Sequence, residues 1–230
     1  MSTTTSPQTA QATQAAKEAV GSKYVKEQMQ TARERTWQVI ERVAPRVVPG
    51  MRESEAAALC KAEMEALGMD RIWHPTIVRF GENTLRMFKE RSVGDPVLRA
   101  NDIFFLDLGV VWGAHEGDAG ATFVVGDDAE MQACAAVAKT LFDDVEQHWR
   151  KTGAAGTALY AYADERAQAL GWRLNLDIKG HRVSDFPHAI YRAGDLGDFD
   201  ACPNAGLWIL EIQIAHPTKP FGAFYEDLLY

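Results

Sequence analysis

The chain of 230 residues has little of what several protein classes require. Its three cysteines, Cys60, Cys134 and Cys202, are odd in number and widely spaced, which excludes a disulfide framework and favours a reducing cytoplasm. They lack the spacing of zinc ligands, so we expect them to be packing residues. No apolar stretch approaches the ~20 residues that a bilayer-spanning helix needs, so no membrane partner is expected.

Positive charge is also scarce. The chain has 24 Lys and Arg against 32 Asp and Glu, a formal net charge of -8, and no run of basic residues. Because nucleic-acid binding needs a basic face, a nucleic-acid partner is excluded. Residues 1–20 lack a basic start followed by an apolar block, so they are not a secretory signal, and their Ser, Thr, Gln and Ala predict a disordered tail. Residues 21–230 are expected to form a single domain.

Apolar periodicity predicts the main elements of this domain. The predicted helices cover 23–44, 53–67, 129–150 and 157–170, and the predicted strands cover 72–80, 103–111, 121–125, 174–178, 208–214 and 224–229. Two glycines between the second and third strands predict a hairpin turn over 112–117. Helices followed by strands occur twice, which indicates two similar α/β halves, about 21–127 and 128–230.

Acidic residues within apolar strands are the first functional signal. Asp107 and Glu211 each interrupt a hydrophobic strand, where a carboxylate is costly to bury unless a cation compensates it. Asp118 lies eleven residues after Asp107, on the other arm of the predicted hairpin, so both can point at one spot. Taken alone, Asp118 is more typical of a turn, and His181 is more typical of a core or surface histidine. Glu226 alone fits a polar chain end as well as a ligand.

Taken together, these four carboxylates and one imidazole are a hard-donor set suited to two divalent cations. Four negative charges balance the four positive charges of such a pair. Ions held in this way activate water for hydrolysis. The residues therefore predict a two-metal hydrolase acting on a small-molecule or short-peptide substrate, with Mn²⁺, Co²⁺, Fe²⁺ or Zn²⁺ as the two divalent metal ions.

The order Asp, Asp, His, Glu, Glu resembles the pita-bread metallohydrolases, which include methionine aminopeptidase, prolidase, aminopeptidase P and creatinase. The resemblance covers about residues 30–226 and includes the eleven-residue gap and a second histidine, His188, seven residues after Gly180-His181. Residues 49–53 and 73–83 resemble the family's entry to its second helix and its Gly-x-Asn turn. The resemblance implies an α+β pita-bread fold, two pseudo-symmetric halves around a central metal site, and a homodimer.

The resemblance also implies a role for each ligand. Asp107 would chelate one metal ion. Asp118 and Glu226 would bridge both ions, and His181 and Glu211 would complete the coordination of the second ion.

Further roles concern catalysis and the substrate. Glu211 is implied as a proton shuttle and His188 as the group that stabilises the developing oxyanion, and Trp73, His74, Phe88 and His188 are expected to contact the substrate. Phe88 stands near the place where the resemblance predicts a histidine. The leading interpretation is a prolidase-like Xaa-Pro dipeptidase or aminopeptidase. The alternatives are a creatinase-like or otherwise repurposed enzyme acting on a non-peptide metabolite, and a non-catalytic binding protein.

Overall fold

The computed structural model describes residues 15–188 and 194–230. Residues 1–14 of the predicted tail lie outside the described residues. Glu18, within the predicted tail segment 1–20, is buried, and its carboxylate accepts hydrogen bonds from Asn204 and from the indole of Trp208. Residues 15–20 therefore pack against the second half of the chain.

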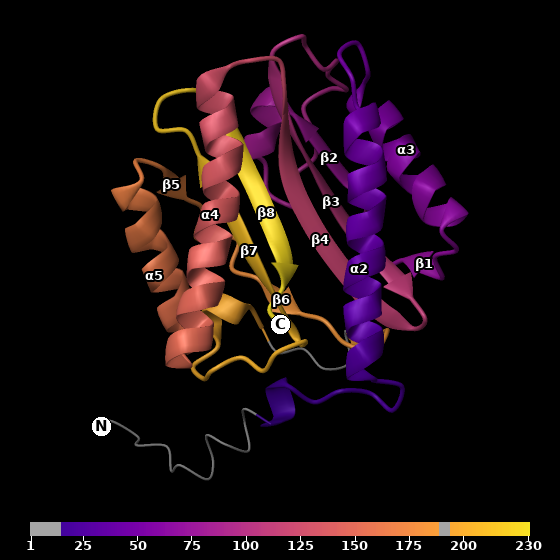
Figure 1. The fold of residues 1–230 in the computed structure, drawn as a ribbon, viewed down its shortest axis with the longest axis vertical. Coiled ribbons are helices and arrows are strands. Elements are labelled where there is room, and N and C mark those ends of the chain that lie inside the picture. Colours follow the sequence, from indigo (N-terminus) through magenta and orange to yellow (C-terminus); the bar gives the residue numbers. More distant parts are fainter. Residues whose placement is uncertain (1–14, 189–193) are drawn as a thin grey trace.

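The helices and strands follow the predicted order (Figure 1). They are α2 (Lys26–Val43), α3 (Glu53–Ala66), β1 (Arg71–Ile72), β2 (Ile77–Phe80), β3 (Asp102–Trp112), β4 (His115–Val125), α4 (Ala129–Thr152), α5 (Gly156–Ala169), β5 (Arg173–Leu174), β6 (His181–Arg182), β7 (Trp208–Ala215) and β8 (Gly222–Leu228), with short 3-10 helices η1 (Ala44–Arg46), η2 (Gly81–Leu85) and η4 (Leu196–Asp198). The four predicted helices are confirmed, with small shifts of their ends.

Three strand predictions were wrong in extent. The strand predicted over 72–80 is two short strands, and Pro75, which has no N–H to donate, lies between them. The strand predicted over 174–178 stops at Leu174, because Asn175 accepts a hydrogen bond from the backbone of Asp177 and turns the chain. The hairpin turn is only Gly113 and Ala114, both with positive φ, so β4 begins earlier than predicted.

The strands of the described residues join one antiparallel sheet, in the order β1-β3-β4-β8-β7-β5, with β2 also paired to β3 and β6 to β7. The two halves meet where β4 pairs with β8. In Figure 1, α2 lies across β3 and β4, and α4 lies across β7 and β8, on the same face of the sheet. The helices thus cover one face, and the residues on the other face are left to build a site.

Strand alternation decides which side chains reach that other face. Leu106 and Leu108 of β3 pack in the core under α2 and α3, so Asp107 between them points away from the helices. Leu210 and Ile212 of β7 likewise pack under α4 and α5, with Glu211 between them. The period of two therefore places acidic residues from both halves on one face.

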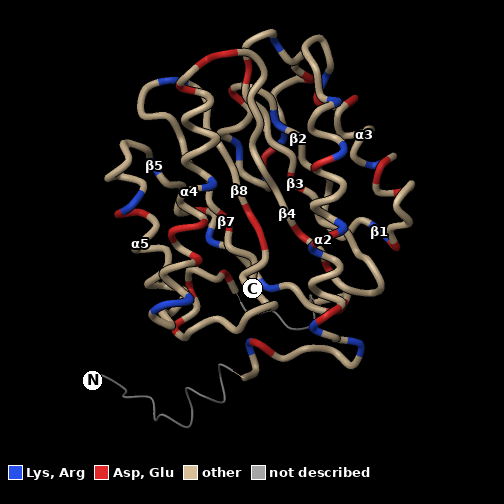
Figure 2. The backbone as a smooth tube through the Cα atoms, viewed as in Figure 1, with Lys and Arg blue, Asp and Glu red and all other residues tan. Residues whose placement is uncertain are grey.

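Figure 2 shows an acidic segment within β8, which holds Glu226 and Asp227. Strand alternation sends these two side chains to opposite faces of the sheet. Asp227 turns toward the helices, where Arg33 of α2 forms an ion pair with it. Glu226, the preceding residue, turns to the opposite face. On one face of the sheet, β8 thus links the two halves through Asp227. On the other face it contributes Glu226 to the site. Within residues 15–188 and 194–230, no helix combines the length and the apolar character of a membrane span.

Candidate metal centre

Three carboxylates form a row across the centre of the sheet, which we call the acidic row: Asp107, Glu226 and Glu211. The register pairs Asp107 with Gly120, Gly120 with Glu226, and Glu226 with Glu211. Adjacent strands lie about 4.8 Å apart, so these side chains converge. Gly120 leaves room for this convergence, because a Cβ atom there would lie 3.0 Å from Glu226 Oε1.

Asp118 and His181 complete the predicted ligand set beside the acidic row. Asp118 precedes Gly120 by two residues on β4, so it shares the same face, and it is almost fully buried. His181 lies in β6, which pairs with β7. The Nε2 atom of His181 is 3.0 Å from Asp118 Oδ2. Its Nδ1 donates to the carbonyl of Arg182 at 3.0 Å, which leaves Nε2 as the lone-pair nitrogen of the neutral ring.

His74 reaches the same carboxylates from the segment between β1 and β2. Its Nε2 lies 3.1 Å from Asp118 Oδ1 and 3.5 Å from Asp107 Oδ1. Its Nδ1 donates to the carbonyl of Pro75 at 2.9 Å. The ring sits over Gly109 of β3, and the side chain is 8 % exposed. His74 is expected to contact the substrate, and it lines the cavity. In the structure its ring also lies against two predicted metal ligands, Asp107 and Asp118.

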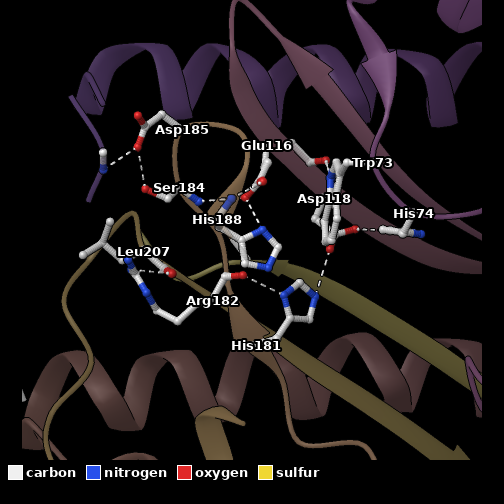
Figure 3. A network of polar contacts seen from close by, with 12 residues as sticks. Trp73, His74, Glu116, Asp118, His181, Arg182, Ser184, Asp185, His188 and Leu207 are labelled. Atoms are coloured by element: carbon white, nitrogen blue, oxygen red, sulfur yellow. Dashed lines mark hydrogen bonds and ion pairs between the residues drawn. The ribbon is translucent and has the colours of Figure 1, made fainter. Parts of the chain in front are cut away.

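His188 is held by a residue that the sequence analysis missed, Glu116. The Nδ1 atom of His188 lies 2.6 Å from Glu116 Oε2 (Figure 3). Glu116 also accepts hydrogen bonds from the backbone N–H groups of Ser184 and His188, and it is fully buried. The only signal in the sequence was its position two residues before Asp118, which puts both on the same face of the strand.

Two aromatic residues form walls of the site. The ring of Trp73 contacts the rings of His74, His181 and His188 edge-on, at centroid distances of 4.6, 5.7 and 5.2 Å. The Phe88 ring meets that of His74 at 5.6 Å and is about half exposed. These walls and the acidic row enclose a cavity of about 260 Å³.

The cavity brings together every residue that the sequence analysis assigned to the site. Its lining includes Trp73, His74, Phe88, Asp107, Asp118, His181, His188, Glu211 and Glu226. A larger hollow of about 620 Å³ lies beside Arg79 and Asp95, but no histidine is among its lining residues. We therefore place the chemistry in the smaller cavity.

The crowded carboxylates differ in their affinity for protons. Burial raises the pKa of Asp107 to about 6 and that of Glu211 to about 7, and it raises the pKa of Glu226 well above its ordinary value. Burial also acts to raise the pKa of Asp118, but the two facing imidazoles lower it to about 2. Negative charge in the acidic row is therefore costly unless a cation offsets it.

The imidazoles have the opposite response. Burial acts to lower the pKa of His74 and His181, but the Asp118 carboxylate and its acidic neighbours outweigh it and raise the pKa values to about 9 and about 10. In the absence of a metal ion, each protonated ring thus supplies the positive charge that offsets the carboxylates. Protons and metal ions compete for the same donors.

The donor set fits divalent cations. Glu226 Oε1 is buried, and no hydrogen-bond donor among the described residues reaches it. Ligand atoms of His74, Asp107 and Asp118 lie within 4.8 Å of one another, as do those of Asp118, His181 and Glu226. Two groups that share one carboxylate match two neighbouring ions with a common bridge.

A comparison with family models supplies the decisive observation, because the model of metallopeptidase family M24 matches residues 27–229. The chain belongs to metallopeptidase family M24. The resemblance stated from the ligand order is thereby confirmed. No curated protein matches the chain in sequence.

Solved structures place this M24 chain in the predicted fold. An X-Pro aminopeptidase from Thermotoga maritima is 18% identical, with a TM-score of 0.72 over 96% of this chain and 64% of its own. A prolidase from Pyrococcus furiosus is 18% identical, with a TM-score of 0.71 over 95% of this chain and 64% of its own. A methionine aminopeptidase from Thermotoga maritima is 16% identical, with a TM-score of 0.67 over 92% of this chain and 98% of its own. The α+β pita-bread fold is confirmed, and the chain spans less than two thirds of the first two proteins.

Proposed function

We propose that this M24 chain is a dinuclear metal-dependent hydrolase that cleaves an amide or peptide bond in a small substrate, as a prolidase-like Xaa-Pro dipeptidase or aminopeptidase. The observation that carries the proposal is the convergence of four carboxylates and His181 on one cavity. The family assignment and the similarity to an X-Pro aminopeptidase and a prolidase support it.

The positions of the side chains support the ligand roles that the resemblance implies. Asp107, at one end of the acidic row, would chelate one ion, and Glu211 and His181 would hold the other. Asp118 and Glu226, which lie between them, would bridge both. Mn²⁺, Co²⁺, Fe²⁺ and Zn²⁺ are all compatible with this donor set. Bound ions of this kind polarise a substrate carbonyl and lower the pKa of water.

Two side chains are suited to handle protons and charge. Glu211 has a pKa raised by burial to about 7, so it can accept and return a proton near neutral pH. His188 is anchored through Nδ1 by Glu116, so its Nε2 would hydrogen-bond the substrate carbonyl or the developing oxyanion. Both groups line the cavity.

The cavity limits the size of the substrate. Its volume of about 260 Å³ is below the roughly 300–1,000 Å³ of sites for drug-sized ligands. Trp73 and Phe88 offer flat apolar surfaces to a small side chain or ring. These features favour a dipeptide or a molecule of similar size. The homodimer stays a prediction.

Phe88 favours a second candidate function. It stands in the cavity wall near the position where the resemblance predicts a histidine. An enzyme without that imidazole has one proton donor fewer for a peptide substrate. A creatinase-like or otherwise repurposed activity on a non-peptide metabolite is therefore our alternative.

Metal analysis and a substrate panel test the proposal. After loading with Mn(II), Co(II), Fe(II) or Zn(II), the purified protein should retain close to two equivalents. Xaa-Pro dipeptides, Met-peptides and small amidines are then offered in parallel. Turnover of the peptides supports the first function, and turnover of the amidines alone supports the second. A protein that retains no ion refutes both.

The substitution Asp118→Asn tests the bridging role directly. The change keeps the shape of the side chain but removes its charge, so metal retention should fall and turnover should drop by more than about 100-fold. Asp143→Asn, on the exposed face of α4, is the matched control and should behave as the wild type. Wild-type turnover by Asp118→Asn would show that the bridge is assigned to the wrong residue.

A further inference from the structure

Two imidazole rings contact the two oxygens of one carboxylate, and each does so through the same ring nitrogen. Asp118 Oδ1 lies 3.1 Å from His74 Nε2, and Asp118 Oδ2 lies 3.0 Å from His181 Nε2 (Figure 3). Each ring also hydrogen-bonds, through Nδ1, the backbone carbonyl of the residue that follows it. The two rings therefore present the same atom, Nε2, to the two oxygens of the same carboxylate.

We propose that His74 is a sixth metal ligand, a nitrogen donor to the ion that Asp107 chelates, so that each ion of the pair carries one imidazole. The inference rests on the dinuclear centre of the proposed function and adds a donor to it. A bridging carboxylate holds one ion at each oxygen. His181 would serve the ion at Oδ2, and His74 faces the place that the ion at Oδ1 would take.

The distances suit a shared ion. Donor atoms that lie about 2.0–2.2 Å from a metal ion are separated from one another by roughly 3–3.5 Å. His74 Nε2 lies 3.1 Å from Asp118 Oδ1 and 3.5 Å from Asp107 Oδ1. The three residues also form one of the two groups whose ligand atoms lie within 4.8 Å of one another.

The surroundings of His74 are built to hold the ring in this place. A Cβ atom at Gly109 would lie 1.8 Å from His74 Cδ2, so only glycine leaves room for the imidazole. Trp73 and Phe88 pack edge-on against the ring from other directions. Because the side chain is 8 % exposed and its Nδ1 is bonded to Pro75, it has no free donor for a substrate.

A sixth ligand of this kind changes metal preference. Carboxylates alone suit Mn²⁺, whereas an imidazole favours the later ions of the first transition row. The loss of His74 should therefore weaken Co²⁺ binding more than Mn²⁺ binding. A role as a buried counter-charge to the carboxylates predicts no such difference between metals.

Calorimetric titration of the full chain with Co(II) and with Mn(II) tests the inference. His74→Phe keeps the ring volume but removes the nitrogen, and it should weaken one of two binding steps by roughly 10- to 100-fold for Co(II), and less for Mn(II). The visible absorption of the Co(II) protein should change with that step. His188→Phe, a histidine in the same cavity but in neither ligand group, is the matched control and should keep both steps.

Gly109→Ala provides a second variant, because it displaces the His74 ring while keeping the imidazole, and it should weaken the same step. Circular dichroism checks that each variant is folded, and Gly109→Ala decides the question if His74→Phe is not. Unchanged affinities for both metals in the folded variants would overturn the inference and leave the proposed function standing. If the wild type binds neither metal, the proposed function fails and takes the inference with it.

Discussion

At the scale of single residues, the site depends on side chains that orient others. Glu116 fixes His188 through Nδ1, and backbone N–H groups hold Glu116 in turn. A buried carboxylate held by three polar contacts is rigid, so the imidazole that it holds is rigid as well. The function of His188 is therefore inseparable from that of Glu116.

We expect Glu116→Gln to lower kcat by roughly tenfold and His188→Ala by roughly 100-fold, with metal content unchanged. The reason is that Gln keeps the shape but loses the charge-assisted bond that orients the ring. Steady-state kinetics of the two single variants and the double variant measure the coupling. The double variant should be no slower than His188→Ala, and multiplicative losses would contradict a role that acts through His188.

At the scale of elements, strand register builds the acidic row. Three antiparallel pairings, β3 with β4, β4 with β8 and β8 with β7, align Asp107, Gly120, Glu226 and Glu211 across the sheet. A shift of one residue in any strand would turn its carboxylate into the core under the helices. Gly120 is the only one of these four residues without a side chain. The space that it leaves allows the Glu226 carboxylate to reach the cavity.

Gly120→Ala should therefore reduce metal affinity by at least about tenfold, because the new Cβ would lie 3.0 Å from Glu226 Oε1 and 2.8 Å from Phe224 Cε1. The strain should also lower the free energy of unfolding by about 1–3 kcal/mol.

Ala119→Gly is the matched control on the helix-facing side of β4. It should lower the free energy of unfolding by about 1 kcal/mol without affecting metal binding. Denaturant unfolding and metal titration separate the two effects, and equal metal affinities in both variants would argue against the packing role of Gly120.

At the scale of the whole molecule, folding gathers groups that compete for protons. Glu211 has its pKa raised from 4.5 to about 7 by burial, and Asp118 outweighs burial to raise the pKa of His74 and His181 from 6.5 to about 9 and about 10. Between about pH 4.5 and 10 the folded protein thus binds more protons at these groups than the unfolded chain. Their contribution to stability is greatest at the acidic end and is lost as pH rises.

Metal ions should reverse this dependence, because they bind the deprotonated donors. We expect the Tm difference between metal-loaded and chelator-treated protein to grow from about pH 5.5 to about pH 8.5, by roughly 3–6 °C per pH unit for each proton released. Comparing the two preparations at each pH cancels groups outside the site. A difference that stays constant across this range would mean that ion binding releases no protons there.

Much of the fold was readable from local patterns. The helices appeared as apolar periodicity, and Asp107 and Glu211 were visible as charges within apolar strands. Strand ends were less predictable. Pro75 acts by lacking an N–H, and Asn175 acts through a single side-chain hydrogen bond, and the periodicity of apolar residues records neither effect. Glu116 gave almost no signal, since its partner, His188, lies 72 residues away along the chain.

The sequence alone determines the order and chemical type of the predicted ligands. It also indicates which residues of a strand share a face, because side chains alternate along a strand. Only the tertiary structure indicates the role proposed for His74 as a metal ligand. Nothing near it in the chain marks it as a neighbour of Asp118, and its place depends on the bare surface of Gly109 in another strand. The chemistry of His74 depends on its distance from Asp118 in β4, and the sequence near either residue does not specify that distance.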